Sequence, residues 1–241
     1  MLWYKAWLET RWRFLIGLAL LTCSAAATVL AYPQVAQLIP LINSNVRGPI
    51  GDAVREAAQL SRDFRGYIWL QWFRQNDARW TSFFVILLGT ATTFGSQRGQ
   101  LFTLSLPVSR ARLLGTRALL GLAESSAIAF LPSLLIPLLA PSIGSHYGLG
   151  AVLIHSACIF IASSVFFCTA LLLSTFFDDP WPPLLLTIVI AFLAAWSGLS
   201  VMSGACYFQT GAIPWLGLVI AAAISSALFA AALVNIQRRD F

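Results

Sequence analysis

The sequence predicts an all-α membrane protein with six transmembrane helices and both termini in the cytoplasm. Hydrophobic residues make up 59% of the 241 residues and charged residues only 10%, and the mean hydropathy is +0.79. A soluble domain is nearer half apolar and about a quarter charged, so lipid must cover much of this chain. This composition excludes a soluble enzyme, a disordered chain and a collagen-like fibre. We expect one transmembrane domain over residues 1–241.

Six apolar segments have the length that a membrane-spanning helix needs, which is about 20 residues. They cover residues 14–32, 80–97, 118–140, 151–177, 183–202 and 215–235. The third is the only one that contains a charged residue, Glu124. Ten-residue stretches of alternating polarity, which are typical of membrane β-barrels, are absent, so the segments are predicted to be helices.

The distribution of basic residues predicts the orientation. With the N-terminus inside, nine of the 15 Lys and Arg residues fall in cytoplasmic segments. The other six all lie in one long outer loop, where the positive-inside rule has less weight. The net charge of +6 comes from basic residues that lie at the ends of the apolar segments. It does not indicate nucleic-acid binding, because no basic stripe is interleaved with aromatic residues.

Two segments outside the spans have features of their own. Residues 1–13 are amphipathic and predict a helix lying in the inner membrane interface, although an ordinary basic and aromatic flank explains them equally well. Residues 33–79 predict an outer helical loop with a helix from Asp52 to Gly66. An outer belt of aromatic residues is expected to follow, formed by Tyr67, Trp69, Trp72, Phe73 and Trp80.

The short connection over residues 203–214 contains glycine and no charge. Such a segment can re-enter the membrane if protein shields its backbone, and an exposed loop is the equal alternative.

Residues that carry out catalysis or bind metals are nearly absent. His146 and His155 have no carboxylate near them in the sequence, and no metalloprotease, serine hydrolase or P-loop motif occurs. The four cysteines form no CxxC pair, so neither a disulfide framework nor a zinc site is indicated. We therefore expect no enzymatic activity, no metal and no cofactor bound by this chain.

The segment over residues 97–117 joins the second and third expected spans on the cytoplasmic side. It predicts a short apolar helix that ends at Pro107, followed by a basic segment that leads back into the membrane. An apolar helix in the cytosol needs a groove to lie in. The residues expected to dock are Arg98, Gly99, Leu101, Phe102, Leu104, Leu106, Pro107 and Arg110.

This segment resembles the membrane-spanning permeases of the type-two class of ATP-binding cassette (ABC) exporters. The matching positions are Gly99, Leu101, Leu104, Leu106, Pro107, Val108, Ser109 and Arg110. The ending over residues 238–241 and the expected six spans also resemble that family. One departure is that Ser96, Gln97 and Gln100 occupy a region where the family often has an acidic residue.

The resemblance implies a permease that dimerises, as a homodimer or a heterodimer, in the inner membrane of a prokaryote. It also implies two cytosolic ABC ATPase subunits that bind ATP and magnesium, and a segment 97–117 that couples them to the permease. Exported substrates in such families include drugs, lipids, polysaccharides and peptides. A non-transporting assembly or sensory subunit is the first alternative. A secondary carrier is the second, although the two halves of the chain share no motif.

Glu124 is the one charge inside an expected span, and Arg117 lies on the same helix face two turns away. A carboxylate in the membrane needs a partner or a polar cavity. The sequence leaves three roles open: a buried pair with Arg117, an interhelical hydrogen bond, or a place in the transport path.

Overall fold

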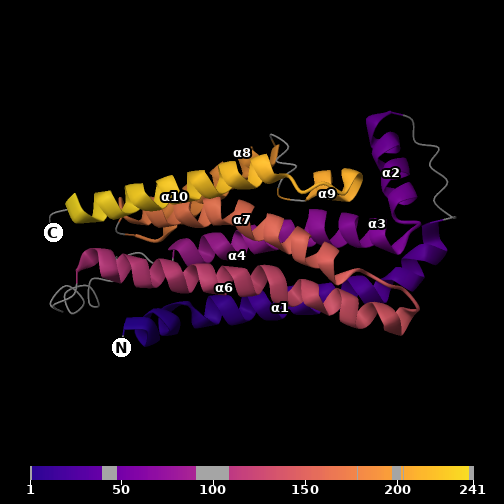
Figure 1. Cartoon of the computed structure of the whole chain (residues 1–241), viewed down its shortest axis with the longest axis horizontal. Helices are drawn as coiled ribbons and strands as arrows, with labels where there is room; N and C mark the ends of the chain where they lie inside the picture. The colour runs from indigo at the N-terminus through magenta and orange to yellow at the C-terminus, as the bar shows by residue number, and fades with distance from the viewer. Residues whose placement is uncertain are drawn as a thin grey trace.

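The computed structural model shows a bundle of long helices (Figure 1). It describes residues 2–39, 48–90, 109–177, 179–196, 202 and 204–238. Within these residues all regular structure is helical. Four helices are long and apolar enough to cross a membrane. They are α1 (Leu2–Leu38), α6 (Arg110–Leu139), α7 (Leu149–Ser174) and α10 (Trp215–Arg238). The expectation of a helical chain with several helices able to span a membrane is therefore confirmed, whereas six spans and cytoplasmic termini stay predictions.

A further long helix runs through the middle of the bundle. It consists of α3 (Phe64–Ile68), a π-helical stretch η2 (Trp69–Asp77) and α4 (Ala78–Thr90). The two junction residues, Ile68 and Ala78, keep right-handed helical backbone angles, so the three pieces form one continuous helix. It packs against α1, α6 and α7. The helix that contains residues 80–90 of the expected second span, residues 80–97, therefore begins well upstream of residue 80.

This helix corrects the expected outer loop over residues 33–79. The separate helix α2 (Pro49–Leu60) begins at a proline and ends at Leu60, with Ser61 as its C-cap, so Gly66 does not end it. Gly66 lies inside α3, where a Cβ atom would collide with the carbonyl oxygen of Leu60. The connection between α1 and this helix is thus shorter than the expected loop, because residues 64–79 belong to the bundle.

The expected aromatic belt is mostly core. Tyr67, Trp69, Trp72 and Phe73 are all buried, and Trp72 and Phe73 are completely so. Only Trp80 of this group is substantially exposed. Tryptophan and tyrosine suit both a membrane interface and a packed interior, and here the neighbouring helices enclose them.

The first helix also differs from its expected form. Residues 2–13 are not a separate interfacial helix, because α1 continues through them into the first span without a break. Ala6 and Thr10 are buried against the bundle, whereas Trp3 and Tyr4 are exposed. The amphipathic pattern of this segment therefore reflects packing on one side of a long helix.

Two shorter helices complete the described chain. The apolar helix α8 (Trp181–Trp196) packs on α4 and α7 and covers most of the expected fifth span. The helix α9 (Ala205–Thr210) lies within the connection over residues 203–214. The ring of Phe208 stacks on Trp69 with centroids 4.4 Å apart, so this connection is not a plain exposed loop.

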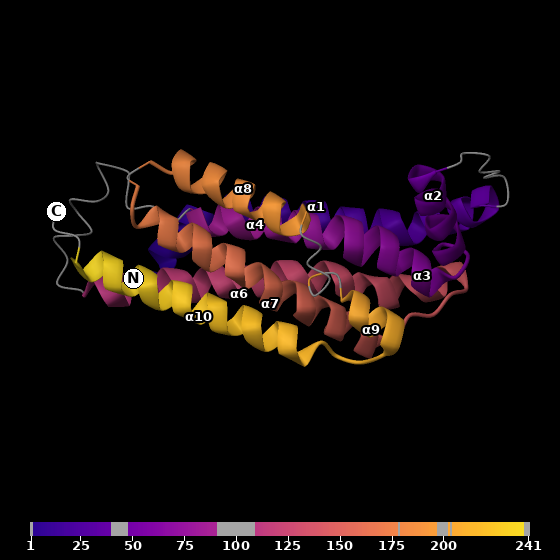
Figure 2. The same cartoon turned by 90° about the horizontal axis from the view of Figure 1, so that it is seen from above.

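The beginning of α1, the beginning of α6 and the end of α10 lie at one end of the bundle (Figures 1 and 2). Helices α2, α3 and α9 lie toward the opposite end. Both ends of the chain therefore lie on the same side of the bundle.

Helix α7 is the central packing element, since it contacts α4, α6, α8 and α10. Its contact with α4 is close at Gly89. A Cβ atom on Gly89 would lie 2.9 Å from the carbonyl oxygen of Phe167 and 2.8 Å from the Cβ of Ala170. A backbone oxygen cannot rotate away, so the two helices require glycine at this position.

We predict that Gly89→Ala lowers the free energy of unfolding by about 1–3 kcal/mol, because the methyl group forces α4 away from α7. The control is Gly115→Ala in α6, where the added Cβ meets nothing within 4 Å and alanine favours the helix. Thermal unfolding of both variants in detergent measures the effect. Equal stability of the two variants would contradict this account of the α4–α7 contact.

Candidate functional site

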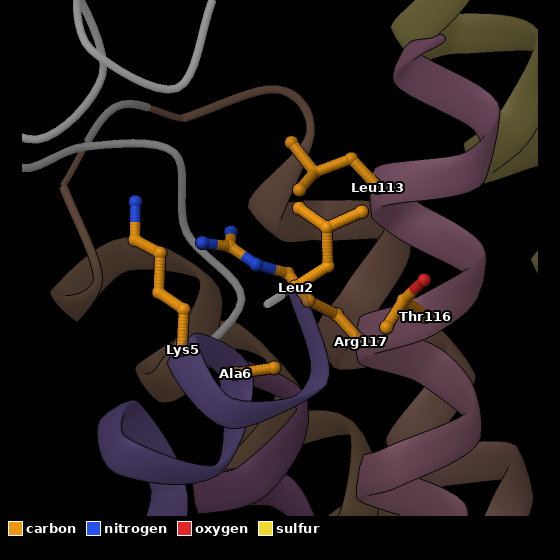
Figure 3. A pocket seen from close by; sticks show the side chains of 6 residues that line it. All are labelled: Leu2, Lys5, Ala6, Leu113, Thr116 and Arg117. Atoms are coloured by element: carbon orange, nitrogen blue, oxygen red, sulfur yellow. The ribbon is translucent and has the colours of Figure 1, made fainter. Parts of the chain in front are cut away.

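The first turns of α1 and α6 lie against each other at the end of the bundle that holds both ends of the chain. A small recess between them is lined by Leu2, Lys5, Ala6, Leu113, Thr116 and Arg117 (Figure 3). Two of these side chains are cationic and most of the others are apolar. Just inside this recess, α1 makes three polar contacts with its neighbours.

The first contact involves the carboxylate of Glu124, which is 4% exposed. The hydroxyl of Thr10 in α1 donates to Glu124 Oε1 at 2.6 Å. The other oxygen, Oε2, is buried without a hydrogen-bond partner among the described residues. An interhelical hydrogen bond therefore provides part of the stabilisation that a buried carboxylate needs.

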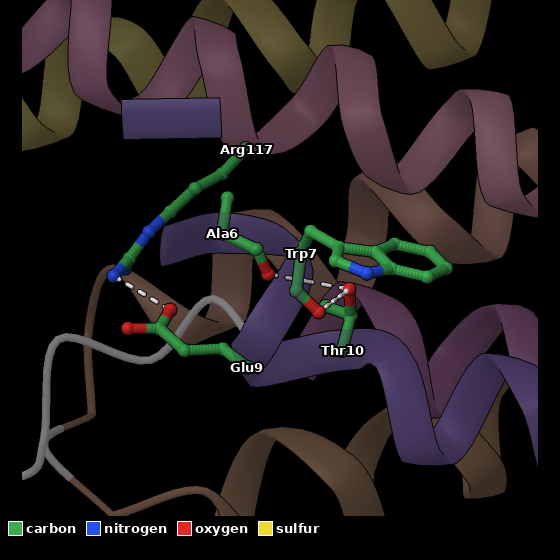
Figure 4. A network of polar contacts seen from close by, with 5 residues as sticks. All are labelled: Ala6, Trp7, Glu9, Thr10 and Arg117. Carbon is green, nitrogen blue, oxygen red and sulfur yellow. Dashed lines mark hydrogen bonds and ion pairs between the residues drawn. The ribbon is translucent and has the colours of Figure 1, made fainter. Parts of the chain in front are cut away.

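The second contact is an ion pair between α1 and α6. Arg117 Nη2 lies 2.9 Å from Glu9 Oε2, and the side chains of Arg117 and Glu9 are 10% and 35% exposed. Figure 4 shows the guanidinium reaching across to the Glu9 carboxylate beside Thr10. Because the arginine is largely shielded from solvent, removing one partner of this pair should lower stability more than breaking an exposed pair would.

The third contact ties α1 to α4. Arg13 Nη1 donates to the carbonyl oxygen of Leu87 at 2.8 Å, one turn before the last described residue of α4. A carbonyl in the last turns of a helix is a favourable partner for a cation.

These contacts join α1 to both of its neighbours within two turns. We call them the α1 polar cluster: Glu9, Thr10 and Arg13 with Leu87, Arg117 and Glu124. The sequence singled out Arg117 and Glu124, and the structure places both at the α1–α6 contact. The sequence did not single out Thr10 or Glu9, because residues 1–13 were interpreted as an interfacial segment.

A second buried network lies deeper in the bundle, around Asp77. Asp77 is fully buried. Its Oδ1 accepts a hydrogen bond from Thr81 at 2.7 Å, and its Oδ2 accepts one from Ser133 of α6 at 2.9 Å. The Ser133 hydroxyl in turn accepts a bond of 2.9 Å from the indole nitrogen of Trp72. Each of these polar groups is therefore satisfied away from water.

This network lies at the end of the π-helical stretch η2. Wider π-helical turns change the direction in which side chains leave the helix, and they occur often at functional sites. Here the stretch aligns Trp72 and Asp77 with one serine on α6. Sequence reasoning missed Asp77 because it was assigned to the outer loop, and no local signal distinguishes a buried aspartate from an exposed one.

The two histidines have different environments. His146 is exposed in the turn before α7, whereas His155 is buried. The His155 ring stacks on Phe73 with centroids 4.6 Å apart and meets Tyr207 edge-on at 5.4 Å. Gly204 lies against His155 Nδ1, in a backbone conformation with φ of +61° that favours glycine. His155 thus helps to hold α9 on α7.

Most of the predicted coupling residues lie outside the residues that the structure describes. These are Arg98, Gly99, Leu101, Phe102, Leu104, Leu106 and Pro107. Arg110 is the first residue of α6. Ser109 precedes it in an extended conformation, and its hydroxyl accepts a hydrogen bond of 3.4 Å from the amide of Arg112. This is an N-cap contact, which fixes where the helix begins.

No known family model matches the chain, and no curated protein and no solved structure is significantly similar to it.

We predict that Ser133→Ala lowers the free energy of unfolding by about 1–3 kcal/mol, since Trp72 and Asp77 each lose a buried hydrogen bond. The matched control is Ser126→Ala on the same helix, because among the described residues the Ser126 hydroxyl bonds only to the carbonyl of Ala123, within its own helix. Unfolding in detergent, followed by tryptophan fluorescence, measures both variants. A loss in Ser126→Ala as large as that in Ser133→Ala would contradict the network.

Proposed function

We propose that this protein is the membrane-spanning subunit of an ABC exporter, with both termini in the cytoplasm. ATP is bound and hydrolysed by separate cytosolic subunits. The observation that carries the proposal is the segment 97–110, whose Leu-rich stretch and Pro-Val-Ser-Arg ending match the coupling segment of such permeases. The substrate is not specified by this segment.

The surrounding fold is compatible with this function. The described chain resumes at Ser109, directly before α6, and α6 begins at the end of the bundle that holds both ends of the chain. Six crossings would use the four long helices together with the continuous helix over residues 64–90 and the shorter α8. An even number of crossings returns the chain to its starting side.

The α1 polar cluster supplies contacts through which a displacement of the coupling segment would be passed on to the helices of the bundle. The segment over residues 91–108 connects α4 to α6, and the cluster ties both of these helices to α1. A displacement of the segment would therefore move three helices together. Coupling of this kind requires continuous contacts between the segment that docks on the ATPase and the interior of the bundle. The cluster provides such contacts at the end of the bundle where α6 begins.

The Glu124 geometry favours a role in helix packing over one in the transport path. Its carboxylate lies at the α1–α6 contact within one chain, where Oε1 accepts a hydrogen bond from Thr10. Proton-driven carriers use chains of titratable groups across the membrane. Glu124 and Asp77 belong to separate hydrogen-bonded sets.

The proposed orientation predicts a labelling pattern. In intact cells, Glu56→Cys on the exposed face of α2 should react with a membrane-impermeant maleimide, and Arg112→Cys should react only after the membrane is permeabilised. The unmodified protein, with its four native cysteines, gives the background. Labelling of Arg112→Cys but not Glu56→Cys in intact cells would reverse the orientation and remove the basis for cytosolic coupling.

The proposed coupling segment predicts the effect of a single charge. Leu104→Asp should reduce co-purification of the ATPase subunit by about tenfold or more and stop transport in vesicles, because an aspartate in an apolar groove loses its hydration without gaining a partner. Membrane insertion and dimer formation should be unchanged. Quantitative immunoblotting of the ATPase after affinity purification of the permease measures the association.

The control for this experiment is Val54→Asp on α2. Val54 is partly exposed and lies at the opposite end of the bundle, so this variant should retain the ATPase. Equal recovery of ATPase with wild type and Leu104→Asp would contradict the coupling assignment. Normal association without any transport activity in the wild type would favour the assembly or sensory alternative.

A further inference from the structure

The carboxyl group of Asp77 lies inside the bundle with no exposed surface. Its Oδ1 lies 2.7 Å from the hydroxyl of Thr81, and its Oδ2 lies 2.9 Å from the hydroxyl of Ser133. Both partners are neutral, and among the described residues the carboxyl has no ion pair. An ionised carboxylate in such a place is a buried charge without a counter-charge, which costs much more free energy than a buried neutral acid.

The helices around Asp77 carry no acidic or basic residue beside it. Its segment η2 packs on α1 and α7, and its carboxyl contacts α6. Residues 14–38 of α1, residues 125–139 of α6 and the whole of α7 contain no Asp, Glu, Lys or Arg. The titratable groups of these segments, of the turn before α7 and of α9 are Cys23, Tyr32, Tyr147, His155, Cys158, Cys168, Cys206 and Tyr207. His155 is the only base among them, and its ring lies against Phe73 and Tyr207.

The nearest arginines of the same helix and of α1 leave the interior or lie far along the bundle. Arg74 and Arg79 belong to the same helix as Asp77, but both side chains are exposed. Arg79 follows Asp77 by two residues, and residues at this spacing do not face each other on a helix. Arg13 of α1 bonds to the carbonyl of Leu87, which lies roughly 15 Å further along the helix than Asp77. None of the three is placed to neutralise the carboxylate.

A neutral carboxylic acid fits the observed contacts without any change in the positions of the heavy atoms. A hydroxyl group can both donate and accept, and its hydrogen rotates to suit its partners. The acid proton can therefore be donated from Oδ1 to Thr81, whose own hydrogen then turns to the backbone carbonyl four residues earlier. Ser133 still donates to Oδ2 and accepts from the indole of Trp72. All polar groups of the network stay paired in the neutral form.

We infer that Asp77 is a proton-binding site, whose carboxyl the folded protein keeps protonated under conditions in which an exposed aspartate is ionised. The bound proton stabilises the contact between the helix over residues 64–90 and α6. Loss of this proton places an uncompensated charge between the two helices, which favours their separation and the entry of water. The inference does not rest on the proposed transport function, because it needs only the packing of these helices.

Infrared spectroscopy of the purified full-length protein in a neutral detergent, at mildly acidic pH, tests the site directly. A protonated carboxyl has a C=O stretching band that a carboxylate lacks. The spectrum of the wild type minus that of Asp77→Asn should contain this band, because asparagine keeps the size of the side chain but carries no acid proton. The matched control is Asp63→Asn, since Asp63 is exposed and makes no side-chain cap bond. Its difference spectrum should lack the band.

Thermal unfolding at several pH values gives a second readout. In the unfolded chain an aspartate ionises at about pH 4, so unfolding of the wild type above this pH releases the proton that Asp77 holds. The stability of the wild type relative to Asp77→Asn should therefore fall as the pH rises from about 4 towards neutral. Asp63→Asn should follow the wild type over this range.

Two results would overturn the inference. One is a difference spectrum between wild type and Asp77→Asn without the protonated-carboxyl band, which would mean that Asp77 is ionised. The other is an unchanged pH dependence of stability in Asp77→Asn. If Asp77→Asn does not fold, Ser133→Ala decides the question, because it removes one hydrogen bond to Asp77 and should shift the band without removing it. A spectrum of Ser133→Ala in which no such band moves would then contradict the site.

Discussion

A polar group inside an apolar helix bundle must find its partner in another polar group of the protein, because neither lipid tails nor apolar side chains can replace the hydrogen bonds of water. The described inner structure follows this constraint. Asp77 is satisfied by Ser133 and Thr81, and Glu124 bonds to Thr10. The hydrogen bond from Ser133 to Asp77 and the one from Thr10 to Glu124 each fix how two helices face each other, since a rotation of either helix would break the bond.

Helix α6 takes part in both buried networks. Near one end it bonds to α1 through Glu124 and Arg117, and deeper in the bundle its Ser133 joins the helix over residues 64–90. These contacts are separated by several helical turns, so α6 is held against two different neighbours along its length. In the proposed function, a helix held at two points along its length would transmit a displacement from the coupling segment to the interior.

The beginning of α1 combines two roles. Its inward face carries Glu9, Thr10 and Arg13, which connect it to α6 and α4. Its outward face carries the exposed apolar residues that would contact lipid, with Lys5 at the edge between the two faces.

The sequence alone determined that the chain forms membrane helices, because length and hydropathy are local properties. The expected span over residues 215–235 lies within α10, and the expected span over residues 118–140 extends only one residue beyond the end of α6. The sequence also identified Glu124 as a residue in need of a partner. It could not assign Thr10 as that partner, because 114 residues separate the two positions and only the packing of α1 on α6 brings them together.

Only the tertiary structure decided which polar and aromatic residues are inside. Trp72 and Asp77 lie in a segment that the sequence predicted to be an outer loop, yet both are fully buried. The same side chains suit an interface or a core, and the difference lies in whether neighbouring helices enclose them. The π-helical stretch over residues 69–77 brings both side chains to Ser133, which lies 61 residues from Trp72 and 56 from Asp77, so no local pattern specifies the contact.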